Sequence, residues 1–406
     1  MIDQILADLR EEAERCIGCG FCETVCPTLP AASFSLWEGA RGRVITGKAL
    51  ADSVNRGESP LSFFDSHFSC LNCFACLYIC PAGVNAGKVS DLSRQLVMEI
   101  GGEQKDPVAW MIARLTETNM NPVGVRESCA DWAEGLEFTK EAEYLLYTGN
   151  MYQLMPYSKR LAELRDRMGK RLSDSLSKAI VRFPSMATFM RGLPDRNEKD
   201  LYDRTLRNIY RLLDKAGIKM WYLGKEEPYP GTFLYDLGYV ERFRRYALRV
   251  HEMLRKTGKT IIVIDPHTYD LLVNTYPKFV RDYSLKVVYY TDLIGGLSLN
   301  KSGEKVVLHE PCHFVLRSGR NPDMRAILSK AADVVLPARS GLRNKCCGGP
   351  DELLYPDIAK RVAEDRFSEL EKVKADRVIT ACPICHSNLN LNGSVMEIAD
   401  YLARQA

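Results

Sequence analysis

Two runs of four cysteines near the start of the chain repeat each other. Both have the spacing C-x2-C-x2-C-x3-C followed by proline; their members are Cys16, Cys19, Cys22 and Cys26 and, 54 positions further on, Cys70, Cys73, Cys76 and Cys80. Thiolate sulfurs that converge from one short loop bind soft metal ions. A single C-x2-C pair would leave zinc, a redox dithiol and coincidence all open, whereas two full copies indicate metal binding.

The spacing is typical of proteins with two cubane clusters, in which three close thiolates bind one [4Fe-4S] cluster and the fourth thiolate reaches the other. The fourth cysteine of each run precedes a proline and is expected to point away from its own loop. The predicted ligands are Cys16, Cys19, Cys22 and Cys80 for the first cubane, and Cys70, Cys73, Cys76 and Cys26 for the second. The alternatives are zinc, which usually takes two separated C-x2-C pairs, and disulfides or buried apolar thiols.

A third group of cysteines lies near the other end of the sequence and consists of Cys312, Cys346, Cys347, Cys382 and Cys385. Gaps of 33 and 34 residues separate its parts, and each gap is longer than one loop. Short apolar runs at 305–308, 333–336 and 376–380 precede these cysteines, and a helical pattern occupies 358–373. We therefore expect parallel strands whose carboxyl ends deliver the cysteines to one place.

Together these motifs resemble those of the CCG-domain proteins, a family that includes the iron–sulfur subunit of glycolate oxidase and the D subunit of heterodisulfide reductase. The resemblance runs from the two ferredoxin motifs to Cys346-Cys347-Gly348 and covers most of the chain. The segment at 38–43, Glu-Gly-Ala-Arg-Gly-Arg, is similar to the glycolate oxidase type. The resemblance implies an iron–sulfur subunit of an oxidoreductase.

The family's CCG cysteines hold a non-cubane four-iron cluster or, in some members, another metal. The resemblance thus implies a third centre, bound by Cys312, Cys346, Cys347, Cys382 and Cys385. One of the two adjacent cysteines could instead only pack, because neighbouring side chains leave an extended backbone in different directions. His309, His313 and His386 flank the cysteines, either as hydrogen-bond donors to sulfur or as ordinary packing residues.

The family usually carries two CCG halves, and the first half of this chain has lost its cysteines. At an offset of 117, the positions of Cys346, Cys347, Cys382 and Cys385 are taken by Tyr229, Pro230, Asp265 and Thr268. Strands are predicted at 144–148 and 260–264, with an amphipathic helix from Val240 to Leu254. Charged helical stretches up to residue 216 indicate an insertion. The fold is expected to repeat without its thiolates, and the Asp and His of 265–268 are expected to cap a turn rather than bind a metal.

The predicted fold class is a multidomain α+β protein, because 406 residues exceed one ordinary core. We expect a helical two-cluster ferredoxin domain over 1–142, a degenerate CCG-like α/β half with the insertion over 143–300, and an intact CCG α/β half over 301–406. Cys129 stands alone in the sequence and is predicted to be a buried bystander.

Composition narrows the possible partners. Lys and Arg number 55 and Asp and Glu number 52, so the net charge is +3. The sequence has no long run of like charges, so nothing in it indicates nucleic-acid binding. No apolar run approaches the roughly 18–20 residues of a membrane helix, and the acidic start does not resemble a signal sequence. Reduced thiols fit a cytoplasmic protein, with at most peripheral contact with the inner face of a membrane.

Two cubanes and a third centre indicate transfer of single electrons. No G-x-G-x-x-G opens a helix after a strand, so the two-electron chemistry is expected on a partner. The resemblance implies an FAD-containing dehydrogenase of a 2-hydroxy acid such as glycolate or D-lactate, with a quinone or other carrier as acceptor. The alternative is a catalytic disulfide reductase with the CCG cluster as active site; the lost half favours the relay. A third hypothesis is a non-redox scaffold with structural zinc.

Overall fold

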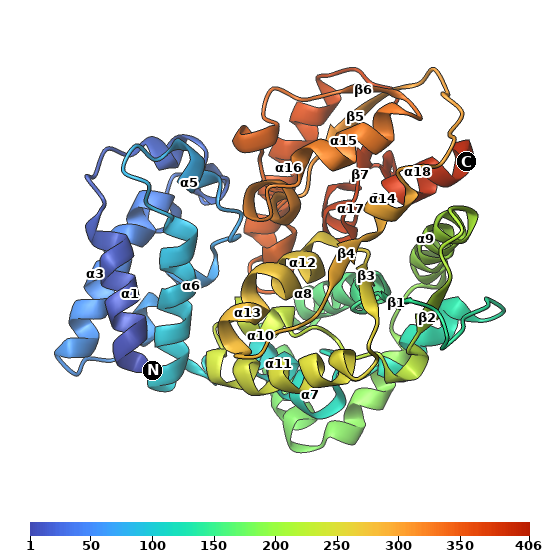
Figure 1. Cartoon of the computed structure of the whole chain (residues 1–406). Coiled ribbons are helices and arrows are strands. Elements are labelled where there is room, and N and C mark those ends of the chain that lie inside the picture. Colours follow the sequence, from blue (N-terminus) through green and yellow to red (C-terminus); the bar gives the residue numbers. More distant parts are fainter.

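The computed structural model describes the backbone of residues 1–406 and all side chains except those of residues 184, 188, 189, 321 and 322. Figure 1 shows a helical body at the left, formed by the N-terminal residues, and two α/β bodies at the right, with the last part of the chain above the middle part. The predicted fold class is confirmed: helices predominate, and two small parallel sheets follow the helical domain.

The N-terminal body is a helical bundle. Its long helices α1 (Ile2–Glu14), α3 (Ala40–Asn55) and α6 (Ala86–Val97) contact one another. Leu9, Leu50 and Val89, one from each helix, are fully buried in their shared core. The shorter helices of this region and the helix that follows it are α2 (Thr28–Ala31), α4 (Phe64–Phe68), α5 (Ala75–Ile79) and α7 (Pro107–Asn119).

The two sheets have the same topology. Their strand orders are β2-β1-β3-β4 and β6-β5-β7-β8, and every pair of neighbours is parallel. The strands are β1 (Tyr144–Tyr147), β2 (Met220–Tyr222), β3 (Thr260–Val263), β4 (Val287–Tyr289), β5 (Lys305–His309), β6 (Asp333–Val335), β7 (Arg377–Thr380) and β8 (Val395–Glu397). All five strands predicted in the two halves are present within two residues of their expected ends.

Equivalent helices precede the third strand of each sheet. These are α11 (Val240–Arg255) and α16 (Pro356–Glu371), which have the same length. The buried face of α11 carries the predicted apolar stripe, including Phe243, Ala247 and Val250. Shorter helices of the α/β bodies are α10 (Thr232–Asp236), α12 (Pro266–Asp270), α13 (Tyr276–Phe279), α14 (Tyr290–Ile294), α17 (Pro383–Leu389) and α18 (Ile398–Gln405).

The first α/β body contains the extra segment that its sequence indicates. Between β1 and β2 the chain forms α8 (Met151–Arg182) and α9 (Arg196–Lys215). The corresponding connection between β5 and β6 contains a single α-helix, α15 (Asn321–Ser329), after a short π-helical turn at His313–Arg317. The domain boundaries at 142 and 300 stay predictions.

The N-terminal body contacts the last α/β body through its cysteine loops. Tyr78 of α5 donates a hydrogen bond to the carbonyl of Leu316 at 2.5 Å. Arg317 donates to the carbonyl of Asn72 at 3.2 Å, and its guanidinium lies 4.3 Å from the centre of the Phe74 ring. The second cysteine motif is therefore held directly against the segment that follows Cys312.

Candidate metal centres

The structure gathers the eight N-terminal cysteines around two cavities. One cavity is lined by Cys16, Cys19, Cys22 and Cys80. The other is lined by Cys26, Cys70, Cys73 and Cys76. Each cavity thus has three cysteines of one run and the fourth cysteine of the other, which supports the predicted exchange of the fourth ligand. The ligand assignment itself stays a prediction.

The two cysteine loops share an unusual backbone conformation. Gly18 and Gly20 flank Cys19 with positive φ angles of 74° and 80°. At the equivalent positions of the second loop, Asn72 and Phe74 flank Cys73 with φ angles of 53° and 62°. A bulky residue such as Phe rarely adopts this left-handed conformation, and its presence marks a backbone held in place by its surroundings. The alternation turns three successive cysteines toward one cavity.

Burial makes these thiols poor acids in the absence of a cation. Desolvation raises the pKa of Cys22 to about 12, and it raises the pKa values of Cys73 and Cys76 well above the ordinary thiol value. Thiolates can persist at such sites only when a metal charge compensates for the lost water, and a coordinating thiol is then deprotonated. The donor set and the cavities therefore fit iron–sulfur clusters.

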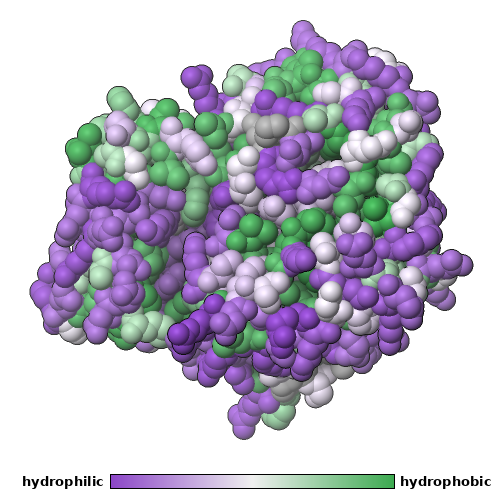
Figure 2. All heavy atoms as spheres, in the orientation of Figure 1, coloured by the Kyte–Doolittle hydropathy of each residue, from purple (hydrophilic) through white to green (hydrophobic). Residues whose placement is uncertain are grey.

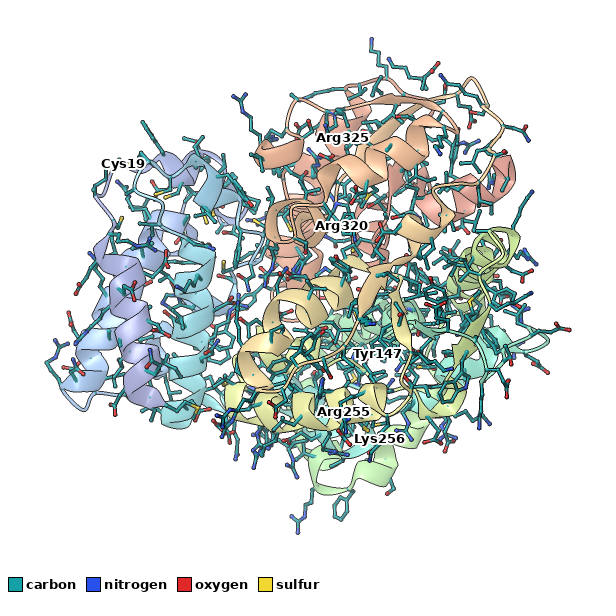
Figure 3. All side chains as sticks on the ribbon, viewed as in Figure 1. Cys19, Tyr147, Arg255, Lys256, Arg320 and Arg325 are labelled. Carbon is teal, nitrogen blue, oxygen red and sulfur yellow. The ribbon has the colours of Figure 1, made fainter. Side chains whose placement is uncertain are left out.

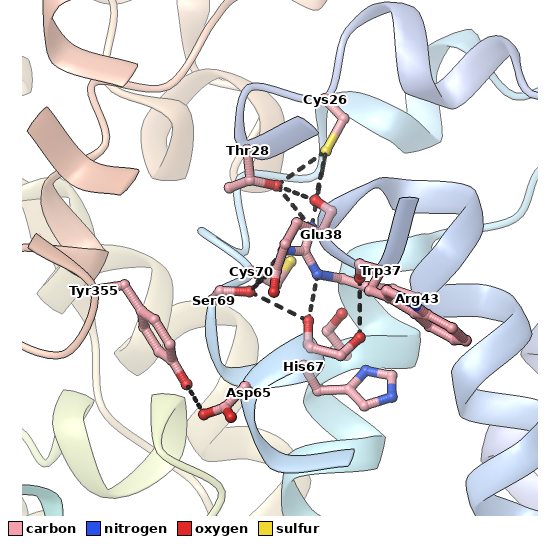
Figure 4. Close-up of polar contacts among 12 residues, drawn as sticks. Cys26, Thr28, Trp37, Glu38, Arg43, Asp65, His67, Ser69, Cys70 and Tyr355 are labelled. Carbon is pink, nitrogen blue, oxygen red and sulfur yellow. Dashed lines mark hydrogen bonds and ion pairs between the residues drawn. The ribbon is translucent and has the colours of Figure 1, made fainter. Parts of the chain in front are cut away.

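A buried arginine that the cysteine motifs do not predict lies beside the second cavity. The Arg43 side chain is 1% exposed and also lines that cavity. It donates hydrogen bonds to Thr28 Oγ1 at 2.8 Å and to Ser69 Oγ at 2.9 Å, and it forms an ion pair with Glu38 at 3.1 Å (Figure 4). The only sequence signal for it was its place in the segment at 38–43.

The five C-terminal cysteines are brought together in the last α/β body. All five are buried, and they share one apolar cluster. Cys312 Sγ lies 3.8 Å from Cys346 Sγ. Hydrogen bonds from Cys346 and then Cys385 lower the pKa of Cys347 against the opposing effect of burial. Cys382 is fully buried and acts electrostatically on Cys347, so it belongs to the same group.

Strand ends and two glycines position these thiols. Cys312 follows β5, and Cys382 follows β7, the parallel neighbour of β5 in the sheet. Gly348 has φ +89°, and a Cβ there would lie 2.6 Å from the carbonyl oxygen of Ala359. The N–H groups of Gly348 and Gly349 donate to Cys346 Sγ and Cys347 Sγ, both at 3.5 Å. Positions 348 and 349 must both be glycine, because α16 and α17 pack directly against them.

The three flanking histidines have different surroundings. One nitrogen of His309 lies within 4.8 Å of the sulfurs of Cys347 and Cys385. Arg366 donates to His309 Nδ1 at 3.1 Å, so the neutral ring carries its proton on Nε2 and can donate it to sulfur. His313 Nδ1 instead pairs with Asp270 at 3.1 Å, and His386 Nδ1 lies 3.2 Å from the Tyr202 hydroxyl. His309 is thus the histidine best placed to support the centre.

The second cavity and the C-terminal thiols are adjacent. Cys73 belongs to the same buried apolar cluster as the five C-terminal cysteines. The pKa of Cys73 is raised first by burial and next by the charge of Cys312. The second cubane set and the C-terminal set are therefore joined, through Cys73, in one buried apolar cluster.

In the first α/β body, the place that corresponds to the C-terminal centre is filled. Register equates Tyr144 of β1 with Val306 of β5, which puts Asn150 at the position of Cys312. At Gly149, an added Cβ would lie 2.7 Å from Thr268 Oγ1 and 3.3 Å from Pro230 Cδ. Asp265 caps α12 by accepting from the Thr268 N–H at 2.9 Å, as its sequence context predicts.

Cys129 lies apart from the three groups. It is 3% exposed, and burial raises the pKa of its thiol. Asn121 donates a hydrogen bond to its sulfur at 3.5 Å.

Within the part of the chain that the structure describes, no helix is both long enough and apolar enough to cross a membrane.

Comparison with known proteins identifies a domain in the N-terminal body and a domain in the last α/β body. Residues 12–84 match the 4Fe-4S dicluster domain, and residues 306–390 match the cysteine-rich CCG domain. These two stretches contain all thirteen cysteines of the predicted centres.

Similar proteins extend over nearly the whole chain. The chain is 26% identical to the EtfAB:quinone oxidoreductase of Syntrophomonas wolfei, with 92% of this chain and 54% of that protein covered. It is 23% identical to the D subunit of dihydromethanophenazine:CoB–CoM heterodisulfide reductase of Methanosarcina barkeri (93% and 88% covered). Identity is 22% to the glycolate oxidase iron–sulfur subunit of Escherichia coli (92% and 89% covered).

The chain spans about half the length of several of the curated relatives it matches. The names of the relatives are consistent with the two iron–sulfur domains, since these relatives include proteins named as oxidoreductases or as their subunits. The chain therefore contains a 4Fe-4S dicluster domain and a CCG domain, and over nearly its whole length it is similar to oxidoreductase subunits that include a glycolate oxidase iron–sulfur subunit and a heterodisulfide reductase D subunit.

Proposed function

We propose that the chain relays single electrons from the flavin of a partner dehydrogenase, acting on a 2-hydroxy acid such as glycolate or D-lactate, to a quinone or another carrier. Two [4Fe-4S] cubanes and a CCG-bound centre, a non-cubane four-iron cluster or another metal, would supply the one-electron redox chemistry. The observation that carries the proposal is the contact between Cys73 of the second cubane set and the cluster of C-terminal thiols.

The residues around this contact favour transfer between neighbouring centres. Leu71 and Ala75 flank Cys73 and are buried with it, so water is excluded from the interface. The hydrogen bond from Tyr78 and the stacking of Arg317 on Phe74 fix the second cysteine loop against the CCG domain. A fixed, dry contact keeps the distance between two redox groups constant and limits the reorganisation of solvent.

The exposure of the cysteines favours one side of the protein for the entry of electrons. Cys19 is exposed, whereas Cys73 and Cys76 are buried. Figure 3 labels Cys19 at the upper edge of the helical body, and Figure 2 shows hydrophobic side chains on that part of the surface. We define the entry patch as the large exposed apolar side chains within two residues of Cys19, Ile17 and Phe21. Exposed apolar residues of this kind are typical of protein-binding surfaces, and the partner dehydrogenase is the proposed occupant.

The direct test is reduction of the clusters by the partner. The full-length protein would be purified anaerobically, mixed with the flavoprotein that co-purifies with it, and supplied with glycolate or D-lactate. We expect electron paramagnetic resonance signals of reduced clusters to appear at the rate of substrate oxidation. If the clusters stay oxidised while the flavoprotein turns over, the relay is wrong.

Disulfide reduction is a separable alternative. It would appear as rapid turnover of a disulfide by the isolated reduced chain, without a quinone or other carrier. The filled position at Gly149, Pro230 and Thr268 argues against two metal centres that flank a disulfide, because the first body offers no matching set of thiols.

We also propose a cytoplasmic location with at most peripheral membrane contact, since thirteen cluster thiols must be kept reduced.

A further inference from the structure

A chamber of about 1190 Å³, measured with its open mouth, lies where all three bodies meet. Cys70 of the second cubane set forms one part of its wall. Gly349 and Ile384, which stand next to CCG cysteines, form another part. Tyr229 and His267, from the body without cysteines, close a third side. The chamber therefore borders the proposed second cubane through Cys70 and the proposed CCG centre through Gly349 and Ile384.

The wall is mainly apolar. Ile112, Val123 and Leu154 are buried side chains of its interior. Leu161 of α8 and Leu354, which precedes α16, also line the chamber and are partly exposed. A ligand that enters would therefore exchange water for apolar contacts, as in most small-molecule sites.

Four buried polar atoms of the wall lack hydrogen-bond partners among the described residues: Asn72 Oδ1, Thr232 Oγ1, His267 Nδ1 and Asp351 Oδ2. The His267 and Asp351 side chains are 5% and 3% exposed. Unpaired polar atoms are costly when buried, and they indicate where a ligand bonds. His267 and Asp351 come from different α/β bodies, so a single ligand could bond to both.

The wall does not suit an anionic ligand. Arg94 is the one lysine or arginine of the wall in the described part of the chain, and its guanidinium already donates to the carbonyls of His67, Cys70 and Asp236. The carboxyl groups of Asp351 and Glu352 also line the chamber. A charged disulfide would therefore meet acidic groups without a free cation.

The wall also does not offer a metal-bound sulfur of the CCG centre to a ligand. None of the five C-terminal cysteines is among the lining residues that the structure describes, because Gly349 and Ile384 lie in front of them. Cleavage of a disulfide at the CCG metal would need direct contact with that centre. Electron transfer across a few ångströms of packed atoms needs no such contact.

We infer that the chamber is the binding site of a quinone ring, with its two oxygens facing His267 and Asp351 and its hydrocarbon tail leaving past Leu161 and Leu354. This inference rests on the relay and names its acceptor site. Reduction converts both C=O groups to C–OH and consumes two electrons and two protons. The electrons come one at a time from the reduced centres that the dehydrogenase supplies. The protons come from solvent by way of Asp351 and His267.

The experiment measures binding of decylubiquinone to the oxidised, cluster-loaded full-length protein by isothermal titration calorimetry. Leu161→Trp and Leu354→Trp narrow the entrance from opposite segments, and each should weaken the Kd at least tenfold. Leu172→Trp, at an exposed leucine of the same helix α8, is the matched control and should bind like the wild type. Two entrance variants keep the test informative if one of them folds poorly.

A second variant series examines the polar contact. His267 stacks on His313 with ring centres 3.8 Å apart, and His267→Phe would keep this stacking while removing the nitrogens. We expect its Kd to weaken about five- to tenfold, with the cluster absorption spectrum unchanged. Unchanged binding in both entrance variants would overturn the inference. It would also be overturned if glutathione disulfide, and not decylubiquinone, bound in a manner sensitive to Leu161→Trp.

The two proposals fail in different ways. If the dehydrogenase reduces the clusters but decylubiquinone does not bind, the chamber assignment is wrong and the relay stands. If decylubiquinone binds with the expected sensitivity but the clusters stay oxidised during turnover of the flavoprotein, the relay is wrong.

Discussion

Arg43 Nη1 lies 3.8 Å from Cys26 Sγ, at the edge of the second cavity. The arginine is almost completely buried, and Glu38 is its ionic partner. A fixed cation beside a cluster stabilises the reduced form, which carries one more negative charge than the oxidised form. The nearby carboxylate of Glu38 acts in the opposite direction.

Removal of either charge should shift the potential of one cluster. We expect Arg43→Gln to lower the reduction potential of the second cubane by about 40–170 mV, because unit charges a few ångströms apart interact by about 1–4 kcal/mol, and about 59 mV corresponds to a factor of ten. Glu38→Gln should raise it. Potentiometric titration followed by electron paramagnetic resonance measures both. Arg56→Gln, at an exposed arginine, is the control; equal shifts in all three variants would contradict the assignment.

The exchange of fourth ligands predicts a reciprocal pair of spectra. Cys80→Ser should perturb the signal of the cluster in the Cys16, Cys19 and Cys22 loop, and Cys26→Ser should perturb the signal of the other cluster. Each variant keeps three thiolates, so serine ligation or a three-iron cluster is the expected change. Electron paramagnetic resonance of both reduced variants tests this. Perturbation of the cluster in the variant's own motif would show that the ligands do not cross.

The C-terminal centre should depend on Cys347 and not on Cys129. Cys347→Ala removes a thiol in contact with Cys346 and Cys385 and should cost the protein one metal centre, about four iron atoms if that centre is a [4Fe-4S] cluster. Cys129→Ala is a matched control, since that cysteine is equally buried and lies outside the three groups. Metal analysis and absorption spectra give the result. An unchanged metal content in Cys347→Ala would remove this residue from the ligand set.

The entry patch predicts a kinetic defect without a spectroscopic one. Phe21 is 56% exposed beside Cys22, and Phe21→Glu would place a charge where an apolar partner surface is proposed. We expect the rate of cluster reduction by the flavoprotein to fall at least tenfold in stopped-flow measurements. Leu248→Glu, at a leucine of α11 that is 47% exposed, should leave the rate unchanged. A normal rate for Phe21→Glu would place electron entry elsewhere.

Glu227 should make stability decrease as the pH rises. Burial raises the pKa of this carboxyl to about 8, although Thr148 donates two hydrogen bonds to it. The folded state therefore holds a proton that the unfolded state releases near pH 4.3, and the associated stability is lost between about pH 4 and 8. Glu227→Gln should remove this part of the pH dependence, with a difference of up to a few kcal/mol. Urea unfolding at pH 5.5 and 8.5 measures it; parallel curves for both proteins would contradict the shifted pKa.

The sequence was sufficient where short-range spacing determines the structure. The cysteine runs, the strands that precede Cys312 and Cys382, and the repeat of the α/β unit could all be predicted, since each depends on a local pattern. The short strands β2 and β8 were missed, whereas β6, which also has three residues, was predicted because it precedes a cysteine of the third group.

Long-range contacts could not be predicted in this way. Arg43 looks like an ordinary helical arginine in the sequence, and only folding brings Glu38, Ser69 and Cys26 around it. The ion pair of Arg317 with Asp270, at 2.6 Å, joins two bodies and has no signature in either segment. The chamber likewise exists only because three bodies meet, and none of them contains it alone.

The identical strand orders of the two sheets have a consequence for how such a protein can change over time. A duplicated unit has two copies of each metal-binding position, so one copy is free to diverge as long as its hydrophobic core persists. Here the core of the first unit is intact, and hydrogen-bonded side chains and a proline occupy the positions that correspond to the C-terminal cysteines. Tyr229, at one of those positions, lines the chamber. A repeated unit without metal ligands can thus supply the wall of a ligand site beside a unit that has them.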